Sequence, residues 1–570
     1  MTGGRLRTPG VALLVLVAYL FSACDGAAPQ GGRTEGTGST AANVDANANR
    51  TLIIAVRTEP KSLTGVDLNP VHVGIAPDAP WQLFHGGLTQ HDEKDVPHLQ
   101  LAESLPTLGT DSWKVFPDGR METTWRLKPN LTWHDGTTVT ADDFVLGVQF
   151  SKGTRSDRLP EVDEILAPDA RTILVRYKSP SPIAGESDWQ PLPRHIIGQT
   201  LEQMDPREAF ATLPFWTTDF VGVGPYRLTG WESGASMSGE AFAGYVHGKP
   251  KIGRIQILFV ADANTAVATL LAGSIHLATD LAVTFEQGQV LRQEWPSRGQ
   301  SGSVLLATAR TVYVQLQFRP EYMRPLTMQD VRMRRALAHA IDKQAIVDAV
   351  LGGEPATADT LVAKEEEYYP ELASILTKYP LDLRRTDELL ADLGYTKDGE
   401  GFYGLGGNRL SIGLIPLGDY LREALILADG WKRAGIDVGL QTLSPAEQTD
   451  QRVASVFPTT IITQFGINPN PFLPWTAGTI ASEATRWAGR NKGAYYDPQM
   501  DRLYEVYSTS LERRDRNRAV MQAMQLIADQ AAYYPLYYAY EVMAHTGGFV
   551  GPRTGKRAAS MLKVEEWNWK

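Results

Sequence analysis

One stretch, from Leu131 to Phe150 (LTWHDGTTVTADDFVLGVQF), restricts the fold of this chain more than any other. Leu131 to Trp133 carries β-formers in near-alternation, the pattern of a half-buried strand. His134-Asp135-Gly136 then makes a tight turn, because glycine tolerates positive φ and aspartate can close an Asx-turn. Thr140 starts a helix, since its hydroxyl can accept from the third amide on while Asp143 reaches back, a capping box. The stretch predicts strand, turn, short strand and capped helix in succession.

The length, net charge and cysteine count of the chain restrict its number of domains and its possible partners. At 570 residues the sequence is too long for one hydrophobic core, so roughly two to four domains are expected. The net charge of -10 argues against nucleic-acid binding, because no basic stripe offers itself to phosphates. The single cysteine, Cys24, excludes an internal disulfide and a multi-thiolate metal site.

The N-terminal segment predicts export and a lipid anchor. Arg5 and Arg7 precede an apolar run, Val11 to Phe21, that is too short to span a membrane permanently, which is typical of a signal peptide over residues 1–23. Small residues stand directly before Cys24, so this site resembles a lipobox, whose cysteine is diacylated. A plain secretory peptide with a chance cysteine is the alternative. Residues 24–49 hold almost no large apolar side chain and predict a flexible tether.

Short blocks of recognisable composition follow along the chain. Thr51 to Val56 reads as a fully buried strand, and Val221 to Tyr226 (VGVGPY) places glycines where one backbone passes close to another. Ile255 to Val260 predicts a strand, and the helix after it is capped near Asp262 and ends at Gly273. Further predicted elements are strands at Thr124 to Leu127, Thr172 to Tyr177, Tyr313 to Phe318 and Ala532 to Tyr538, and one amphipathic helix from Asp330 to Ile346.

Together these blocks resemble the peptide/nickel-type solute-binding proteins of ABC importers, the large oligopeptide-binding class known as family 5. The resemblance rests on the F/W-H-D-G and T-A-D-D motifs, on WQLFHGGL, LQLAES, VGVGPY and AYYPLYY, and on their order between about residue 50 and residue 545. It implies an α/β, two-lobed periplasmic-binding-protein fold (class II, large type), with two hinge strands and an extra sub-domain inserted in the first lobe.

The resemblance also implies the domain boundaries and the partners. Lobe I would comprise residues 50–88, 206–310 and 541–570, the inserted sub-domain residues 89–205, and lobe II residues 311–540. A protein of this class captures a peptide or another small polar solute by lobe closure and performs no covalent chemistry. The resemblance therefore implies an extracytoplasmic, lipid-anchored monomer that serves ABC permease subunits, with no catalytic residue, metal ligand or cofactor.

The segment Thr460 to Leu473 departs from the family pattern at the strand closest to the ligand. Where the family carries an acid that pairs with the α-ammonium of a peptide, the aligned residue is Phe465, and the acid before proline is replaced by Asn468. An unpaired ammonium there would cost several kcal/mol. The ligand is therefore predicted to be a modified peptide or a neutral oligosaccharide, unless an acid such as Glu59 or Asp67 supplies the missing charge.

Amide and aromatic side chains are the candidates for ligand contact, because they suit a polar ligand that stacks on flat rings. For Trp216, Tyr245, Tyr537 and Tyr538 only the position in the pattern argues for a role, and core packing is the alternative. The candidates for the cleft are Gln464, Phe465, Asn468, Asn470, Trp475, Trp487, Trp216, Tyr245, Tyr537, Tyr538 and Glu59.

Other functions remain open on the sequence alone. A secreted hydrolase is the rival class, with His134 and Asp135 as half of a triad, but no G-x-S-x-G or H-E-x-x-H motif accompanies them. A nickel or haem carrier of the same fold is a second rival, although the ten histidines are scattered. A sensor that delivers its ligand to a receptor would have the same sequence features as an importer component.

Overall fold

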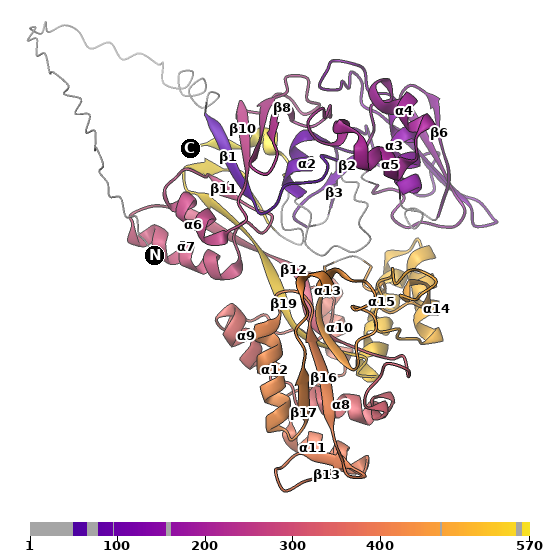
Figure 1. Ribbon diagram of the computed structural model, residues 1–570. Helices are drawn as coiled ribbons and strands as arrows, with labels where there is room; N and C mark the ends of the chain where they lie inside the picture. The colour runs from indigo at the N-terminus through magenta and orange to yellow at the C-terminus, as the bar shows by residue number, and fades with distance from the viewer. Residues whose placement is uncertain are drawn as a thin grey trace, which may run out of the picture. The chain divides into compact units, whose positions relative to one another are not determined.

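The computed structural model describes residues 50–64, 78–94, 96–154, 161–187, 189–467, 470–554 and 561–570. The predicted signal peptide and tether, with Cys24, lie outside the described residues, as do Asp67 and Asn468. Within the described ranges, one mixed sheet with the strand order β17-β16-β18-β12-β19-β11-β1-β10-β9-β8 organises the fold (Figure 1). Its strands are β1 Thr51–Val56, β8 Tyr226–Glu232, β9 Ser236–Ala241, β10 Arg254–Phe259, β11 Leu277–Ala278, β12 Gly302–Leu316, β16 Ser411–Pro416, β17 Asp437–Leu440, β18 Thr460–Gly466 and β19 Tyr533–Thr546.

The two longest strands, β12 and β19, form the centre of this sheet. They pair antiparallel from Gly302↔Thr546 to Gln315↔Tyr533, with register shifts near Ala309 and after Val312. At one end β11 pairs with β19, and at the other β18 pairs with β12 from Arg310 to Leu316. The strands predicted from 313–318 and 532–538 are confirmed, and each belongs to a much longer strand that links the two ends of the sheet (Figure 1).

β1 explains the apolar run that follows residue 50. It pairs in parallel with β10 and with β11, so both of its edges are hydrogen-bonded. Parallel strands of this kind are covered on both faces, which requires apolar side chains at successive positions. Leu52, Ile54, Ala55 and Val56 are fully buried. The cap predicted at Asp262 is also confirmed, because its carboxylate accepts from Thr265 N at the start of α6 (Ala263–Leu271).

A second, four-stranded sheet stands in residues 113–177. Its strands run in the order β4 (Trp113–Val115), β5 (Met121–Arg126), β7 (Thr172–Tyr177) and β6 (Val162–Asp169), and α3 (Ala141–Thr154) packs on it. Trp125, Trp133 and Phe144 are fully buried in the core beneath this sheet. These elements therefore have a core of their own. The elements fall within residues 89–205, where the sequence predicts an inserted sub-domain. The domain boundaries stay a prediction.

The stretch from 131 to 150 folds mostly as predicted. In the turn, Asp135 Oδ1 accepts from Thr137 N at 2.9 Å and Gly136 has φ +89°. The strand predicted over 131–133 is wrong: only an isolated bridge joins Thr132 to Thr138. Trp133 N donates to Thr137 O and Val139 N donates to Leu131 O, so the two sides of the turn pair too briefly for a regular strand, and His134 N donates to the distant carbonyl of Gly222.

The helix cap at Thr140 differs from the expected capping box in one hydrogen bond. Asp143 Oδ2 accepts from Thr140 N at 2.8 Å, as predicted, but the Thr140 hydroxyl also donates to this carboxylate and does not accept from Asp143 N. Asp143 Oδ1 accepts in addition from Arg194 N. Burial nevertheless raises the pKa of Asp143 above its usual value, because desolvation exceeds the stabilisation by these hydrogen bonds.

The region 330–346 forms two helices, so the single predicted helix is wrong. α8 (Val331–His339) ends where Ala340 leaves helical geometry, and α9 (Lys343–Leu351) begins with Asp342 as its N-cap. Asp342 accepts from Ala345 N at 2.9 Å. An aspartate in the middle of an amphipathic pattern competes for the helix amides, and here it starts a new helix.

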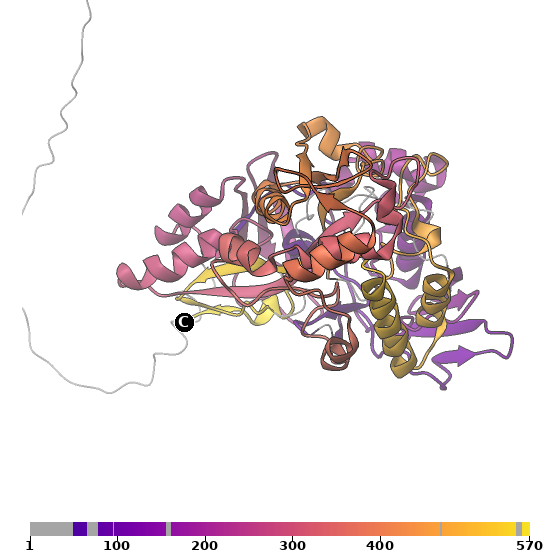
Figure 2. The same cartoon turned by 90° about the horizontal axis from the view of Figure 1, so that it is seen from below.

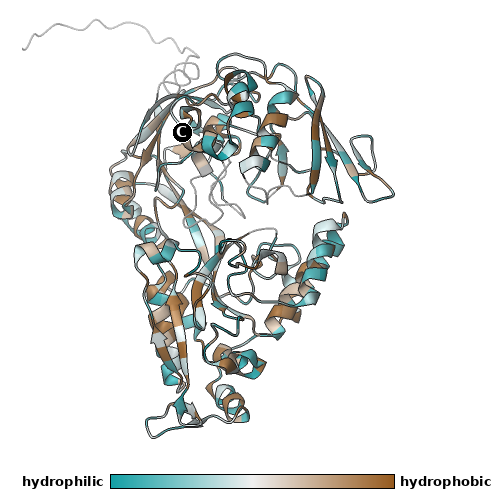
Figure 3. Cartoon of the chain, turned by 45° about the vertical axis from the view of Figure 1, so that its right-hand side comes forward, coloured by the Kyte–Doolittle hydropathy of each residue, from teal (hydrophilic) through white to brown (hydrophobic). Residues whose placement is uncertain are grey.

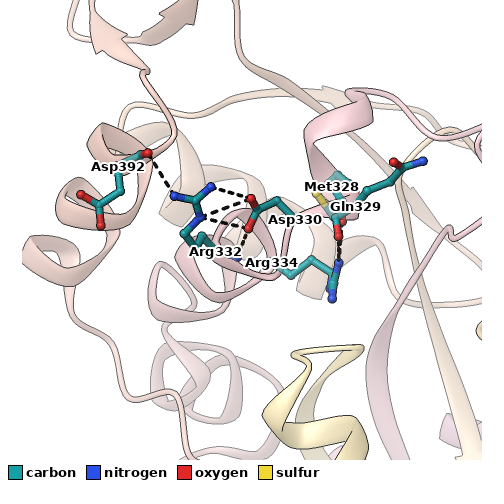
Figure 4. A network of polar contacts seen from close by, with 6 residues as sticks. All are labelled: Met328, Gln329, Asp330, Arg332, Arg334 and Asp392. Atoms are coloured by element: carbon teal, nitrogen blue, oxygen red, sulfur yellow. Dashed lines mark hydrogen bonds and ion pairs between the residues drawn. The ribbon is translucent and has the colours of Figure 1, made fainter. Parts of the chain in front are cut away.

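Arg334 of α8 shows how a buried cation is held without a carboxylate partner. Its guanidinium donates to the carbonyls of Met328 and Gln329 at 2.8 Å (Figure 4). It also donates to the carbonyl of Gln530 at 3.0 Å. The neighbouring Arg332 pairs instead with Asp330, the N-cap of α8, at 2.7 Å (Figure 4). These contacts join α8 to the loop before it and to the end of α15 (Arg513–Asp529), which supports a structural role for this block.

The remaining helices cover the sheets and carry the polar surface. Apolar colour follows the strands of the large sheet, and polar colour lies on the outer faces of the helices (Figure 3). α14 and α15 pack side by side over a common apolar core (Figures 1 and 2). The further helices are α2 Asp78–Phe84, α4 Gln199–Gln203, α5 Pro206–Thr212, α7 Phe285–Ser297, α10 Tyr369–Ile375, α11 Leu383–Asp392, α12 Leu421–Arg433, α13 Pro445–Thr449, α14 Pro498–Thr509 and α15 Arg513–Asp529. Short pairings are β2 Thr89–His91 with β3 Pro97–Leu99, β13 Thr396–Lys397 with β14 Tyr403–Leu405 and β15 Asn408–Arg409, and β20 Phe549–Val550 with β21 Asn568–Trp569.

The VGVGPY segment passes against the end of α2, as predicted. Gly224 N donates to the carbonyl of Phe84 at 3.2 Å. A Cβ atom at Gly224 would lie 2.4 Å from the carbonyl carbon of Phe84 and 2.5 Å from His85 N. The same segment binds His134, whose Nδ1 accepts from Gly222 N while Nε2 donates to Gly224 O. Burial lowers the pKa of His134 to about 4, so the ring is neutral at pH 7.

Replacing Gly224 with alanine is therefore expected to destabilise the fold. The added methyl group meets backbone atoms, which cannot rotate away, so we expect a loss of about 3 kcal/mol in the free energy of unfolding. Gly230→Ala is the matched control, because nothing lies within 4 Å of a Cβ there, and its change should stay within about 0.5 kcal/mol. Urea denaturation followed by tryptophan fluorescence measures both. Equal stability of the two variants would contradict the close approach.

Candidate functional site

A cavity of about 900 Å³ opens beside the central strands of the large sheet. Its walls come from β12, β18 and β19, from the end of β1, from the loop that leads into α7, and from the start of α12. Two further segments, 448–454 and 489–492, complete it. Sites for small molecules typically measure roughly 300–1,000 Å³, so this cavity has the size of a ligand site.

Tyr420 and Gln464 meet at one side of the cavity. The Tyr420 hydroxyl donates to Gln464 Oε1 at 2.5 Å, and Arg310 Nη1 reaches the same oxygen at 3.4 Å. Burial raises the pKa of Tyr420, so its hydroxyl remains a donor at neutral pH. These two donors fix the carboxamide of Gln464 through its oxygen, which assigns the amide orientation.

A buried tyrosine–carboxylate pair lies in the same wall. The Tyr537 hydroxyl donates to Glu423 Oε1 at 2.6 Å, and both side chains are almost completely buried. Burial, followed by the charge of Glu423, raises the pKa of Tyr537. The hydrogen bond joins β19 to α12, so it connects the central strand to a helix that lines the cavity.

Lys492 lies at another part of the lining. Its Nζ donates to Gln451 Oε1 at 2.6 Å and to the carbonyl of Trp487 at 2.9 Å. Its pKa is lowered to about 8, first by burial and then by the positive charges of Arg490 and Arg319. The ammonium is thus partly buried, bound to neutral acceptors and surrounded by other cations.

The structure brings only part of the predicted set to the cavity. Gln464, Phe465 and Tyr537 line it, and Pro474 lines it next to Trp475. Trp475 itself packs in the core with Tyr495 and Tyr533. Trp487 lies beneath Arg319 and Arg452, and its carbonyl holds Lys492. The role of each residue in ligand contact stays a prediction.

The other candidates make contacts within the fold, away from the cavity lining. Trp216 Nε1 donates to Ala209 O at 2.9 Å, and the hydroxyl of Tyr538 donates to Val362 O at 2.7 Å. Tyr245 is buried beside Gln100. Glu59 accepts from Trp231 Nε1 at 2.6 Å and from Gly234 N, and Asn470 Oδ1 accepts from Phe472 N.

Several lining residues had no signal in the sequence. Arg310, Tyr420, Glu423 and Lys492 stand in segments whose local pattern reads as strand, helix start or loop. Strand pairing of β12 with β18 and β19, together with the packing of α12 and of the loop before Gly493 on these strands, places these segments together. Within the described ranges, no group of three or more histidine, cysteine, aspartate or glutamate side chains could hold a metal ion.

The comparison with family models decides the class of this chain. Residues 103–482 match the model of the bacterial extracellular solute-binding proteins, family 5, middle region. This match covers well over half of the chain. The chain belongs to family 5 of the bacterial extracellular solute-binding proteins. The resemblance found in the sequence is thereby confirmed.

Relatives of this family 5 protein agree in length and fold. The chain is 27% identical over 456 residues to protein XP55 of Streptomyces lividans, covering 77% of this chain and 75% of XP55. It superposes with TM-score 0.72 and 19% identity on the oligopeptide-binding protein of Thermus thermophilus, complexed with a pentapeptide, covering 91% and 96% of the two chains. NikZ of Campylobacter jejuni, in complex with Ni(L-His), gives TM-score 0.69 and 21% identity, covering 91% and 99%.

These superpositions confirm the α/β, two-lobed periplasmic-binding-protein fold. Proteins of family 5 are extracytoplasmic, and their characterised function is solute binding for transport. Among the helices of the described ranges, none combines the length and the apolar character that crossing a bilayer requires.

Removing the hydroxyl of Tyr537 tests the buried pair in the cavity wall. In Tyr537→Phe, the carboxylate of Glu423 loses its donor while remaining buried, so the free energy of unfolding should fall by about 1–3 kcal/mol. Tyr540→Phe is the matched control on the same strand: within the described part of the chain the Tyr540 hydroxyl makes no hydrogen bond. Urea denaturation compares the two. An unchanged free energy of unfolding in Tyr537→Phe would contradict a stabilising hydrogen bond between Tyr537 and Glu423.

Proposed function

We propose that this family 5 protein captures a short peptide, or a peptide-like polar solute, in the cavity between β12, β18, β19 and α12 and delivers it to an ABC permease. The observation that carries the proposal is the composition of the cavity at its size of about 900 Å³. Aromatic and aliphatic side chains such as Tyr313, Phe465 and Ile461 supply apolar surface, while fixed polar groups supply direction.

Both signs of charge occur in the lining, which suits a zwitterionic peptide. Asp280, Asp419 and Glu423 are among the acids, and Arg310 and Lys492 are among the bases. The absence of an acid at Phe465 therefore does not leave the cavity without carboxylates. The α-ammonium group of a peptide can be compensated by an acid other than one at position 465, as the sequence left open. Glu59 is not required for this compensation, because its carboxylate already accepts from Trp231 Nε1 and Gly234 N.

Solute capture by this fold depends on contact with both ends of the central sheet. The cavity is lined by Arg57 and Asp280 from the β1 and β11 end and by Gln464 and Tyr420 from the β18 and α12 side. A solute that contacts both groups stabilises the arrangement in which they are close, which is how binding shifts the population of a closed state.

Calorimetric titration tests the solute class. We expect binding of unblocked tri- to pentapeptides from a defined mixture, and no heat from cello- or chito-oligosaccharides or from Ni(L-His), the ligand named for NikZ. Mass spectrometry of the protein purified from its host without denaturation should show a co-purified peptide. Binding of the oligosaccharides alone would support the neutral-ligand alternative, and binding of Ni(L-His) alone the nickel alternative.

We also propose that Cys24 carries the lipid anchor of the mature protein, followed by the tether of residues 24–49. The support is the sequence: an apolar run, small residues and then the single cysteine. Two acyl chains suffice for stable membrane binding, whereas one is marginal.

Substituting the cysteine tests the anchor. In Cys24→Ala, expressed in the native host, the protein should move from the membrane fraction to the aqueous fraction or the medium, and incorporation of labelled palmitate should be lost. Ser22→Ala is the control, because it keeps a small residue before the cysteine. Retention of Cys24→Ala in the membrane would contradict lipidation at this site.

A further inference from the structure

We propose that Lys492 forms, with its neighbouring cations, a subsite for a carboxylate group of the bound solute. This inference rests on the proposed function, since it names the part of the solute that one side of the cavity recognises. The carboxylate can belong to the C-terminus of a peptide or to an acidic side chain, and both present the same pair of oxygens to an ammonium.

The position of Lys492 follows from the packing of its segment on the sheet. Phe318 N donates to Gly493 O at 2.8 Å, and a Cβ at Gly493 would lie 2.0 Å from the carbonyl oxygen of Leu316. The segment 489–493 therefore lies directly against the end of β12. Gln315, whose Cγ would also contact that Cβ, lines the cavity together with Lys492.

Phe465 lies on the same face of the sheet as Gln315, the strand residue beside the Lys492 segment. Side chains alternate between faces along a strand, so Tyr313 and Gln315 of β12 share one face. Tyr313 pairs with Thr463 of β18, and Phe465, two residues on, lies on that face as well. Tyr313 and Phe465 pack in one apolar cluster, and the charge of Arg490 lowers the pKa of Tyr313, against the larger effect of burial. The face that lacks the family's acid thus carries cations.

The ammonium of Lys492 has capacity for an anion. It has three donor hydrogens and makes two hydrogen bonds, to an amide oxygen and to a carbonyl. Among the described residues its hydrogen-bond partners are these two neutral oxygens, and the charges that act on it are those of Arg490 and Arg319. A partly buried cation beside other cations is unfavourable unless an anion compensates it. A carboxylate of the solute compensates the charge of Lys492, so the contact that binds the solute also removes the unfavourable energy of the unpaired cation.

The surrounding charges make this subsite cationic overall. Arg490 and Arg319 act on Lys492 directly, and Arg452 lies 5.9 Å from the ring of Trp487, whose carbonyl binds Lys492. Asp450, from the segment that also supplies Gln451, is one of the acids that line the cavity. The free ammonium therefore loses its proton near pH 8, and a bound carboxylate should raise that pKa.

Three sets of peptides of equal length test the inference by calorimetry. The first has free N- and C-termini and neutral side chains, the second has the C-terminus amidated, and the third is amidated but contains one glutamate. We expect the first or the third set to bind about tenfold to a hundredfold more tightly than the second. Which of the two binds identifies the source of the carboxylate.

Substitutions of Lys492 separate the charge from the packing. Lys492→Met should abolish the preference for carboxylate peptides, and Lys492→Arg, which keeps the charge, should retain most of it. Lys432→Met, at the exposed end of α12, is the control and should change nothing. At pH 8, titration in two buffers of different ionisation enthalpy should show more proton uptake on binding by the wild type than by Lys492→Met, because the α-ammonium of the peptide, with a pKa of about 8, contributes equally in both.

The outcomes distinguish this inference from the proposed function. If all three sets bind equally, or if Lys492→Met keeps the preference and the proton uptake, the subsite is disproved while peptide capture stands. If no set binds and no peptide co-purifies, the proposed function itself fails. Circular dichroism and thermal unfolding of Lys492→Met confirm that any loss comes from the site and not from the fold.

Discussion

The antiparallel pairing of β12 with β19 is the interaction on which the rest of the structure depends. It runs from Gly302↔Thr546 to Gln315↔Tyr533, and every other strand of the large sheet is joined to this pair directly or through a neighbour. The backbone hydrogen bonds of two long strands hold their side chains at fixed spacing. Tyr313, Gln315 and Tyr537 therefore enter the cavity from a rigid base, while loops and helix ends supply the rest of its lining.

Charge is distributed in the cavity in a way that the sequence pattern did not indicate. Phe465, where the sequence predicts that the family's acid is missing, packs with Tyr313 and Trp475 in a core. The charged groups near this face include Lys492 and Arg490, whereas Glu423 and Tyr537 lie with Tyr420 and Gln464 in another part of the wall. The cavity thus has separate places for positive and negative groups of a solute, as binding of a zwitterion requires.

Prediction from sequence succeeded where local chemistry decides the structure. Asp135 and Gly136 make the turn with little help from the rest of the chain, and Asp262 caps its helix in the predicted way. It failed at two places: the pairing across the turn after Trp133 is too short for a regular strand, and Asp342, inside an amphipathic pattern, caps a second helix. Trp216 and Tyr538, chosen by position alone, bind backbone carbonyls within the fold.

The sequence by itself determined the family and most of the order of the elements, because motifs, turn residues and apolar periodicity are local properties of the chain. The tertiary structure alone decided which polar groups meet in the cavity. Lys492, Gln464 and Tyr420 belong to different segments, and their proximity depends on strand pairing and packing between residues far apart in the chain. Such long-range contacts leave no periodic signal, so the chemistry of the site became visible only once the chain was folded.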